Sequence, residues 1–183
     1  MHAELKTDAP RSAKASRSMA RVLGAALMAS LLALPTHAAE TVLTVISPEQ
    51  TLTLTADEFR ALPHSEVTAT DPHMKAEHRY SGVPLRDLLA KLGAPLGDKL
   101  RGPALQLAVV FHSKDGYSTL FALAEFDEAF SDRVILLADG EDGKPLPENA
   151  GPLRVVAPGD KRAARWARMV TSIELVRLPE KTR

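Results

Sequence analysis

The sequence predicts an α+β fold: a single β-rich domain built on a mixed sheet, with about three short helices. Short runs of β-branched and aromatic residues recur along the chain and are separated by turn residues. Helix signals occur at only three places and cover few residues each. About 145 residues remain after an N-terminal leader, which is enough for one domain with its own core. We expect this domain over residues 39–178, followed by a flexible tail at 179–183.

The first 38 residues have the pattern of a secretory signal peptide. A basic segment precedes an apolar run at 22–34, and Pro-Thr-His-Ala follows at 35–38 with small residues at the positions that a signal peptidase recognises, so cleavage is expected after Ala38 or Ala39. The apolar run is shorter than the roughly 20 residues that cross a bilayer. We therefore expect a Sec-type signal and a periplasmic or secreted protein with no membrane attachment after cleavage. Met19 is an alternative start to Met1.

Removal of the leader changes the charge of the protein. The whole chain has 23 basic and 23 acidic residues, of which five basic and two acidic residues lie in the leader. This leaves 18 basic against 21 acidic residues, a net charge of −3. A mildly acidic domain without a basic tract is not expected to bind nucleic acid, because such binding depends on neutralising phosphates. The chain has no cysteine, so no disulfide can support the core.

The N-terminal half alternates strand and helix signals. Strands are predicted at 42–46, 51–54, 67–69 and 79–83, the first two as a hairpin. Thr55 and Glu58 have the spacing of a capping box and predict a helix start, and Pro63 ends that helix early. Residues 71–74 are predicted to be a turn.

The best-specified helix is predicted to begin at Pro84, because proline is preferred at the first helical position. Four leucines follow with the i, i+3, i+4, i+7 spacing of one buried face: Leu85, Leu88, Leu89 and Leu92. Gly93 supplies the stop.

The C-terminal half is mostly strand. Strands are predicted at 105–111, 117–121, 133–138, 153–157 and 173–176, with a hairpin turn at 114–116. Leu123, Phe126 and Phe130 predict a third short helix between them. The acidic segment 139–143 is interpreted as a hairpin turn, because its oxygen ligands do not alternate as a calcium loop requires.

One segment combines several features of a ligand site. A strand closed by Pro158-Gly159 is followed by Lys161, Arg162 and Arg165 beside Trp166, the chain's single tryptophan. Clustered cations, backbone amides and an indole face suit an anionic or flat heterocyclic ligand. Structural roles stay open for each: Trp166 as a core residue, and Lys161 and Arg162 as solvated loop charges.

Several motifs occur in one order along the chain. They are Tyr-Ser-Gly-Val-Pro-Leu-Arg-Asp-Leu-Leu at 80–89, Asp-Gly-Tyr at 115–117, Leu-Leu-Ala at 136–138, Gly-Lys-Pro-Leu at 143–146, Gly-Pro-Leu-Arg-Val-Val-Ala-Pro-Gly at 151–159 and Arg-Trp at 165–166. Together they resemble the oxidoreductase molybdopterin-binding domain, the sulfite-oxidase-like fold, over about residues 43–176. In that family a cysteine ligates molybdenum in a loop that corresponds to 68–73 here, and this loop has no thiol. A hydroxyl or carboxylate does not replace a soft thiolate donor, so oxo transfer does not carry over.

The resemblance also implies cofactor-binding residues. It places Tyr117, Arg154, Arg165 and Trp166 in the ligand cleft, and Lys161 and Arg162 join the arginines if a cofactor phosphate is bound. A structural cation bonded to a carboxylate is the favoured alternative for Arg154. We expect no catalytic residue and no resident cofactor, with molybdopterin as the alternative.

Histidines offer a second kind of chemistry. His64, His73 and His78 lie near Asp71 and Glu77, and these residue types suit zinc or copper. The spacing matches no compact motif, so they are interpreted as surface histidines and no metal site is predicted.

These observations favour a non-catalytic periplasmic domain of the molybdopterin-oxidoreductase type that binds a small anionic ligand or a partner protein. Two alternatives stay open. One is a molybdopterin-dependent oxidoreductase that holds its cofactor without a protein thiolate. The other is a pure interaction module of a periplasmic signalling system.

Overall fold

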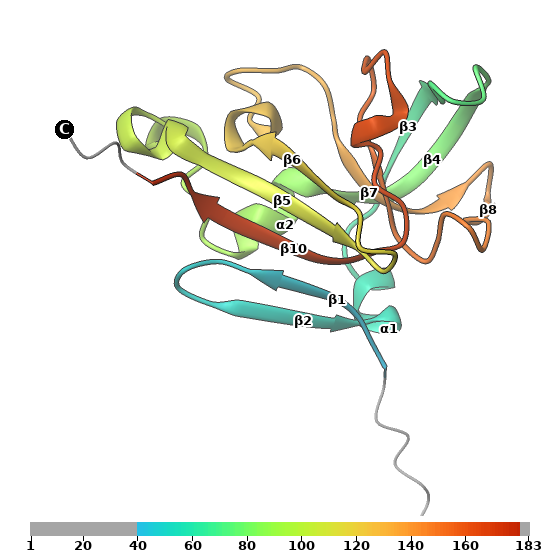
Figure 1. Cartoon of the computed structure of the whole chain (residues 1–183), viewed down its shortest axis with the longest axis horizontal. Helices are drawn as coiled ribbons and strands as arrows, with labels where there is room; N and C mark the ends of the chain where they lie inside the picture. The colour runs from blue at the N-terminus through green and yellow to red at the C-terminus, as the bar shows by residue number, and fades with distance from the viewer. Residues whose placement is uncertain (1–39, 180–183) are drawn as a thin grey trace, which may run out of the picture. The chain divides into compact units, whose positions relative to one another are not determined.

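The computed structural model describes residues 40–179, which form two β-sheets with short helices between the strands (Figure 1). The predicted signal peptide and most of the predicted tail lie outside the described residues. Within residues 40–179, no helix is long and apolar enough to cross a membrane.

The first sheet has the strand order β2-β1-β10-β5-β6 (Figure 1). Its strands are β1 (Thr41–Ile46), β2 (Thr51–Thr55), β5 (Leu107–Ser113), β6 (Ser118–Ala122) and β10 (Val170–Arg177). The pairing of β1 with β10 is parallel and the other pairings are antiparallel, so the sheet is mixed as predicted. Both predicted hairpins, β1–β2 and β5–β6, are present.

The second sheet has the order β3-β4-β7-β8, and β9 pairs with β7 as well. Its strands are β3 (Ser65–Thr70), β4 (Glu77–Pro84), β7 (Leu136–Glu141), β8 (Lys144–Pro145) and β9 (Arg154–Val156). At Gly82 the backbones of β4 and β7 approach so closely that a Cβ would lie 2.3 Å from the carbonyl oxygen of Leu137. Only glycine, which has no Cβ, fits at this close approach of the two paired strands.

Within residues 40–179, two α-helices are present rather than three: α1 (Ala56–Arg60) and α2 (Leu85–Lys91). The predicted capping box of α1 is confirmed, since Thr55 and Glu58 exchange side-chain and backbone hydrogen bonds. Gly93 ends the α2 segment with a φ of +74°. The third predicted helix is only a 3₁₀ turn, η3 (Leu123–Phe126), and Phe130 lies beyond it, exposed. Further 3₁₀ turns are η1 (Gly97–Lys99), η2 (Gly102–Gln106) and η4 (Ala163–Arg165).

The strand predicted at 133–138 begins later and ends later, as β7. Arg133 is held outside the sheet by ion pairs with Glu125 and Asp160, which explains the later start. The predicted turn at 139–143 is in fact the end of β7 and a tight turn into β8, where Asp142 and Gly143 both have positive φ. That geometry favours Asp-Gly in a two-residue hairpin.

One hydrophobic core joins the two sheets and α2. The four leucines of the α2 segment are at most 1% exposed, which confirms the predicted buried face. Phe111, Phe121 and Phe126 pack with ring centroids 5.6–6.3 Å apart at the β5–β6 end. This core leaves five polar or charged residues buried, and two of them, Asp71 and Arg154, belong to the candidate site.

Candidate functional site

A cluster of polar side chains gathers where the ends of β3, β4, β7 and β9 meet. We call Asp71, His78, Tyr80, Glu141 and Arg154 the Arg154 cluster. Asp71 follows β3, Glu141 ends β7 and Arg154 begins β9. His78 and Tyr80 lie two residues apart on β4, so they share one face of the strand. Antiparallel pairing places Tyr80 opposite Glu141, which brings β4 and β7 together at the cluster.

The centre of the cluster is a buried ion pair. Arg154 donates from Nη2 to Oδ2 of Asp71 over 2.6 Å, and the two residues are 6% and 2% exposed. The other oxygen of Asp71 accepts backbone N–H groups of His73 and Met74, at 2.7 and 3.0 Å. Burial acts to raise the pKa of Asp71, but the hydrogen bonds from Met74, Arg154 and His73 hold this pKa below its usual value. Asp71 therefore stays ionised and fixes both its own turn and Arg154.

Aromatic rings enclose the Arg154 guanidinium. Its Cζ lies 5.2 Å from the ring centre of Trp166 and 5.7 Å from that of Tyr80, and the two rings meet edge to face. Trp166 is 3% exposed and donates its Nε1–H to the carbonyl of Ala157, so it is a core residue as well as a cover for Arg154. Glu141 lies 3.9 Å from the guanidinium.

Three buried polar atoms of the cluster have no hydrogen-bond partner within residues 40–179: Nε2 of His78, the hydroxyl of Tyr80 and Nε of Arg154. Burial raises the pKa of Tyr80 to about 12, so its hydroxyl stays protonated. Buried polar groups without partners are rare in native proteins and call for an explanation.

A pocket of about 350 Å³ opens over the cluster, and we call it the Arg154 pocket. Asp71, Glu141, Arg154 and Trp166 form its inner wall, and Arg168 is on its rim. A larger hollow of about 880 Å³, between Phe59, Lys114 and Lys144, shares no residue with the cluster, and no buried charged side chain lines it. The Arg154 pocket is therefore the stronger candidate site.

The six predicted binding residues do not converge. Arg154 and Trp166 line the Arg154 pocket, and Lys161 and Arg162 are exposed on the neighbouring loop. The hydroxyl of Tyr117 donates to the carbonyl of Ala164 over 2.6 Å and ties the β5–β6 turn to η4.

Arg165 faces a different network from Arg154. It bonds both Asp160, at 2.7 and 2.9 Å, and Glu125, and its Cζ lies 4.3 Å from the ring centre of Phe121. The hydrogen bonds that Arg165 donates to Asp160 are the largest of the effects that raise the pKa of Arg165. Its charge is thus already neutralised by carboxylates of the protein. Arg154 is likewise bonded to a carboxylate, that of Asp71, as its favoured structural interpretation predicts.

Nothing in the sequence places Tyr80 in a site. Sequence reasoning offers Asp71 only as a possible metal ligand, and it interprets the segment that contains Glu141 as a turn. It also interpreted His78 as a surface histidine, whereas its side chain is 17% exposed and contacts Glu141 and Asp142. Strand alternation on β4 could have paired His78 with Tyr80, but the predicted strand begins at residue 79, two residues after β4 begins, and so leaves His78 out. No sequence pattern placed Glu141 and Asp142 beside His78, because that contact depends on the pairing of β4 with β7.

Residues 32–183 match the family described as "Oxidoreductase molybdopterin binding domain". The chain belongs to this family. Among solved structures, the molybdopterin-binding-domain protein is similar to the sulfane dehydrogenase SoxCD from Paracoccus pantotrophus, with 18% sequence identity and a TM-score of 0.55. The match covers 75% of this chain and 38% of that chain, and it shows a shared fold. No curated protein matches the sequence. The resemblance drawn from the sequence motifs is confirmed.

The residues of the site do not fit a molybdenum centre held by a protein thiolate. The chain has no cysteine, and in the loop at 68–73 the carboxylate of Asp71 is bound to Arg154 and to its own turn. The cations predicted to hold a cofactor phosphate include Arg154 and Arg165, and both are paired with carboxylates. A phosphate would have to displace those carboxylates.

Proposed function

We propose that this domain is a periplasmic or secreted, non-catalytic member of the family that binds a small anionic molecule in the Arg154 pocket. The observation that carries the proposal is the buried Asp71–Arg154 ion pair. The loop that supplies a metal-ligating thiolate in the family here supplies a carboxylate, which is committed to a neighbouring arginine. The location rests on the leader pattern at residues 1–38.

The charges around the pocket support an anionic ligand. Inside it, Arg154 is bonded to Asp71, and Glu141 lies 3.9 Å from the same guanidinium, so the cations left for an anion are those outside this group. Arg168 on the rim and Lys161 and Arg162 nearby are exposed, and within residues 40–179 none of the three has an ion-pair partner. A volume of about 350 Å³ lies at the low end of the range for ligand pockets, which favours a small molecule.

The molybdopterin-dependent alternative is supported by the family match and is tested first. The full chain is produced in a host that makes the molybdenum cofactor, purified without denaturation, and assayed for molybdenum and for pterin fluorescence. We expect neither. Stoichiometric molybdenum with metal-dependent turnover of a small substrate would reject a non-catalytic role.

Ligand binding is tested through Trp166, because the only tryptophan of the chain lines the pocket. Inorganic phosphate, sulfate and a small dicarboxylate are titrated at constant ionic strength while the indole emission is recorded. We expect a saturable change with at least one anion, weakened by Arg168→Ala. Arg101→Ala is the matched control, since Arg101 is exposed and lies outside the pocket lining. Equal weakening in both variants, or no saturable change, would contradict anion binding in this pocket.

A further inference from the structure

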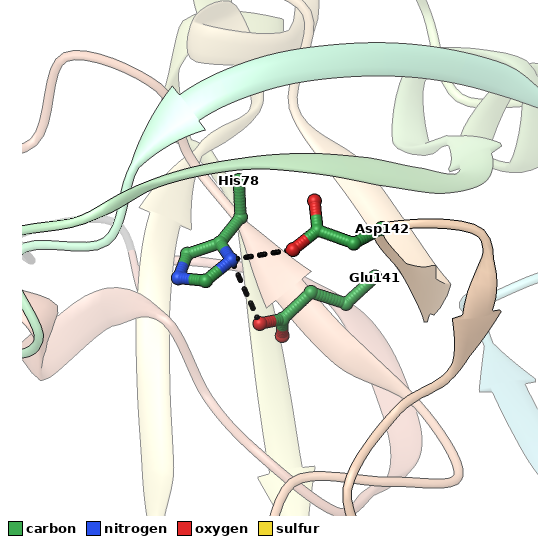
Figure 2. A group of neighbouring side chains, drawn as sticks. All are labelled: His78, Glu141 and Asp142. Atoms are coloured by element: carbon green, nitrogen blue, oxygen red, sulfur yellow. Dashed lines mark hydrogen bonds and ion pairs between the residues drawn. The ribbon is translucent and has the colours of Figure 1, made fainter.

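His78, Glu141 and Asp142 present three potential metal ligands to one point (Figure 2). Nδ1 of His78 lies 2.8 Å from Oδ2 of Asp142 and 3.2 Å from Oε1 of Glu141. In a tetrahedral zinc site with bonds of about 2.0–2.1 Å, neighbouring ligand atoms are about 3.3 Å apart. Both distances from His78 are near this spacing, and all three ligand atoms lie within 4.8 Å of one another.

The backbone fixes all three ligands. His78 and Glu141 are on the paired strands β4 and β7, and Asp142 begins the tight turn that follows. The second oxygen of Asp142, Oδ1, accepts the N–H of Arg79 over 2.9 Å, an outer contact of the kind that orients metal-ligating carboxylates. Asp142 has a side-chain exposure of 55%, against 17% for His78 and 13% for Glu141, so an ion can reach the site from solvent.

The charge around this point suits a dication. Asp71, Glu141 and Asp142 contribute three carboxylates, and Arg154 is the one cation bonded within the group. With His78 neutral, the local charge is −2, which a divalent ion would cancel. Two buried polar atoms of β4, the Tyr80 hydroxyl and Nε2 of His78, make no hydrogen bond in the described chain, and Tyr80 is paired with Glu141 across β4 and β7.

We infer that His78, Glu141 and Asp142 form a site for a divalent transition-metal ion, with the remaining coordination positions open to water. One imidazole with two carboxylates favours an ion of the zinc type over magnesium or calcium, which prefer oxygen ligands alone. Water on the ion supplies hydrogen-bonding partners of the kind that the Tyr80 hydroxyl lacks. This site goes beyond anion binding in the Arg154 pocket and involves no molybdenum.

The test is calorimetric titration of Zn²⁺ into the tag-free full chain and three variants. His78→Ala removes the imidazole. Asp142→Asn removes a ligand charge and keeps the turn, because Asn-Gly is as well suited to this hairpin as Asp-Gly. His64→Ala is the matched control, since His64 is also a partly exposed histidine paired with a carboxylate, Asp139, but with a single one.

We expect one zinc ion per chain, at least about tenfold weaker binding in His78→Ala and Asp142→Asn, and unchanged binding in His64→Ala. Circular dichroism verifies that each variant is folded. The site is refuted if the wild-type chain binds no zinc saturably, if both site variants bind like wild type, or if His64→Ala weakens binding as much as they do. The anion titration relies on different variants, so either proposal can fail alone.

Discussion

Replacement of Arg154 by methionine tests whether the buried ion pair holds this domain together. Methionine retains an unbranched apolar side chain and removes the guanidinium. Asp71 would keep the two backbone N–H groups on Oδ1 but lose the partner of Oδ2, although it is only 2% exposed. Burial of an unpaired carboxylate is the main cost, because little water can reach it.

The expected loss of unfolding free energy is about 3–5 kcal/mol, as found when one partner of a buried pair is removed. Loss of the cation beside the Trp166 and Tyr80 rings, at 5.2 and 5.7 Å, acts in the same direction. The total stability of a domain is about 5–15 kcal/mol, so this single change removes a large share of it.

Urea unfolding, monitored by circular dichroism, measures the effect: the urea concentration at the midpoint should fall while the dependence of the unfolding free energy on urea stays unchanged. The double variant Arg154→Met/Asp71→Asn removes both charges. Its loss of unfolding free energy should be smaller, by at least about 1 kcal/mol, than the summed losses of the single variants Arg154→Met and Asp71→Asn. Arg86→Met is the matched control, because Arg86 pairs with Glu128 at the surface and is 40% exposed. Its loss should stay below about 1 kcal/mol. If Arg154→Met costs no more than Arg86→Met, the buried pair does not stabilise the fold and the reasoning fails.

Three further variants test the core, a strand crossing and the pH dependence. Leu88→Ala should lower the unfolding free energy by about 2–5 kcal/mol, since this fully buried side chain leaves a cavity. Gly82→Ala should lower it by about 1–3 kcal/mol or more, because the new Cβ would meet the Leu137 carbonyl at 2.3 Å. The pKa of Asp127 is lowered in the folded protein, chiefly because its carboxylate accepts a hydrogen bond from the backbone N–H of Gly97. The ionised Asp127 therefore stabilises the fold fully above about pH 4, the pKa of an unfolded aspartate, and this stabilisation is lost as the pH falls through the lower pKa of the folded state. Asp127→Asn should therefore cost about 1.5–3 kcal/mol at pH 7 and progressively less in acid.

Urea unfolding at a series of pH values measures all three. A Leu88→Ala loss below about 1 kcal/mol would mean that the site collapses around the cavity. An unchanged Gly82→Ala protein would show that β4 and β7 can separate at no cost. A constant Asp127→Asn difference between pH 7 and pH 3 would contradict the lowered pKa of Asp127.

The elements predicted correctly depend on neighbours in sequence. The capping box at Thr55 and Glu58 needs residues three apart, and the buried face from Leu85 to Leu92 needs one helical period. The elements predicted poorly depend on distant contacts. Arg133 is predicted to begin a strand, but its ion pairs with Glu125 and Asp160 hold it outside the sheet.

The sequence by itself determined the family, through the order of its motifs, and the lack of a thiolate ligand, through its composition. It also identified Arg154 and Trp166 as candidate pocket residues. Only the tertiary structure decided what these residues face: Asp71 lies 83 residues from Arg154, and Asp142 lies 64 residues from His78. The physical reason is that strand register and sheet order, rather than spacing along the chain, determine which charges meet, and burial strengthens the contact between Asp71 and Arg154.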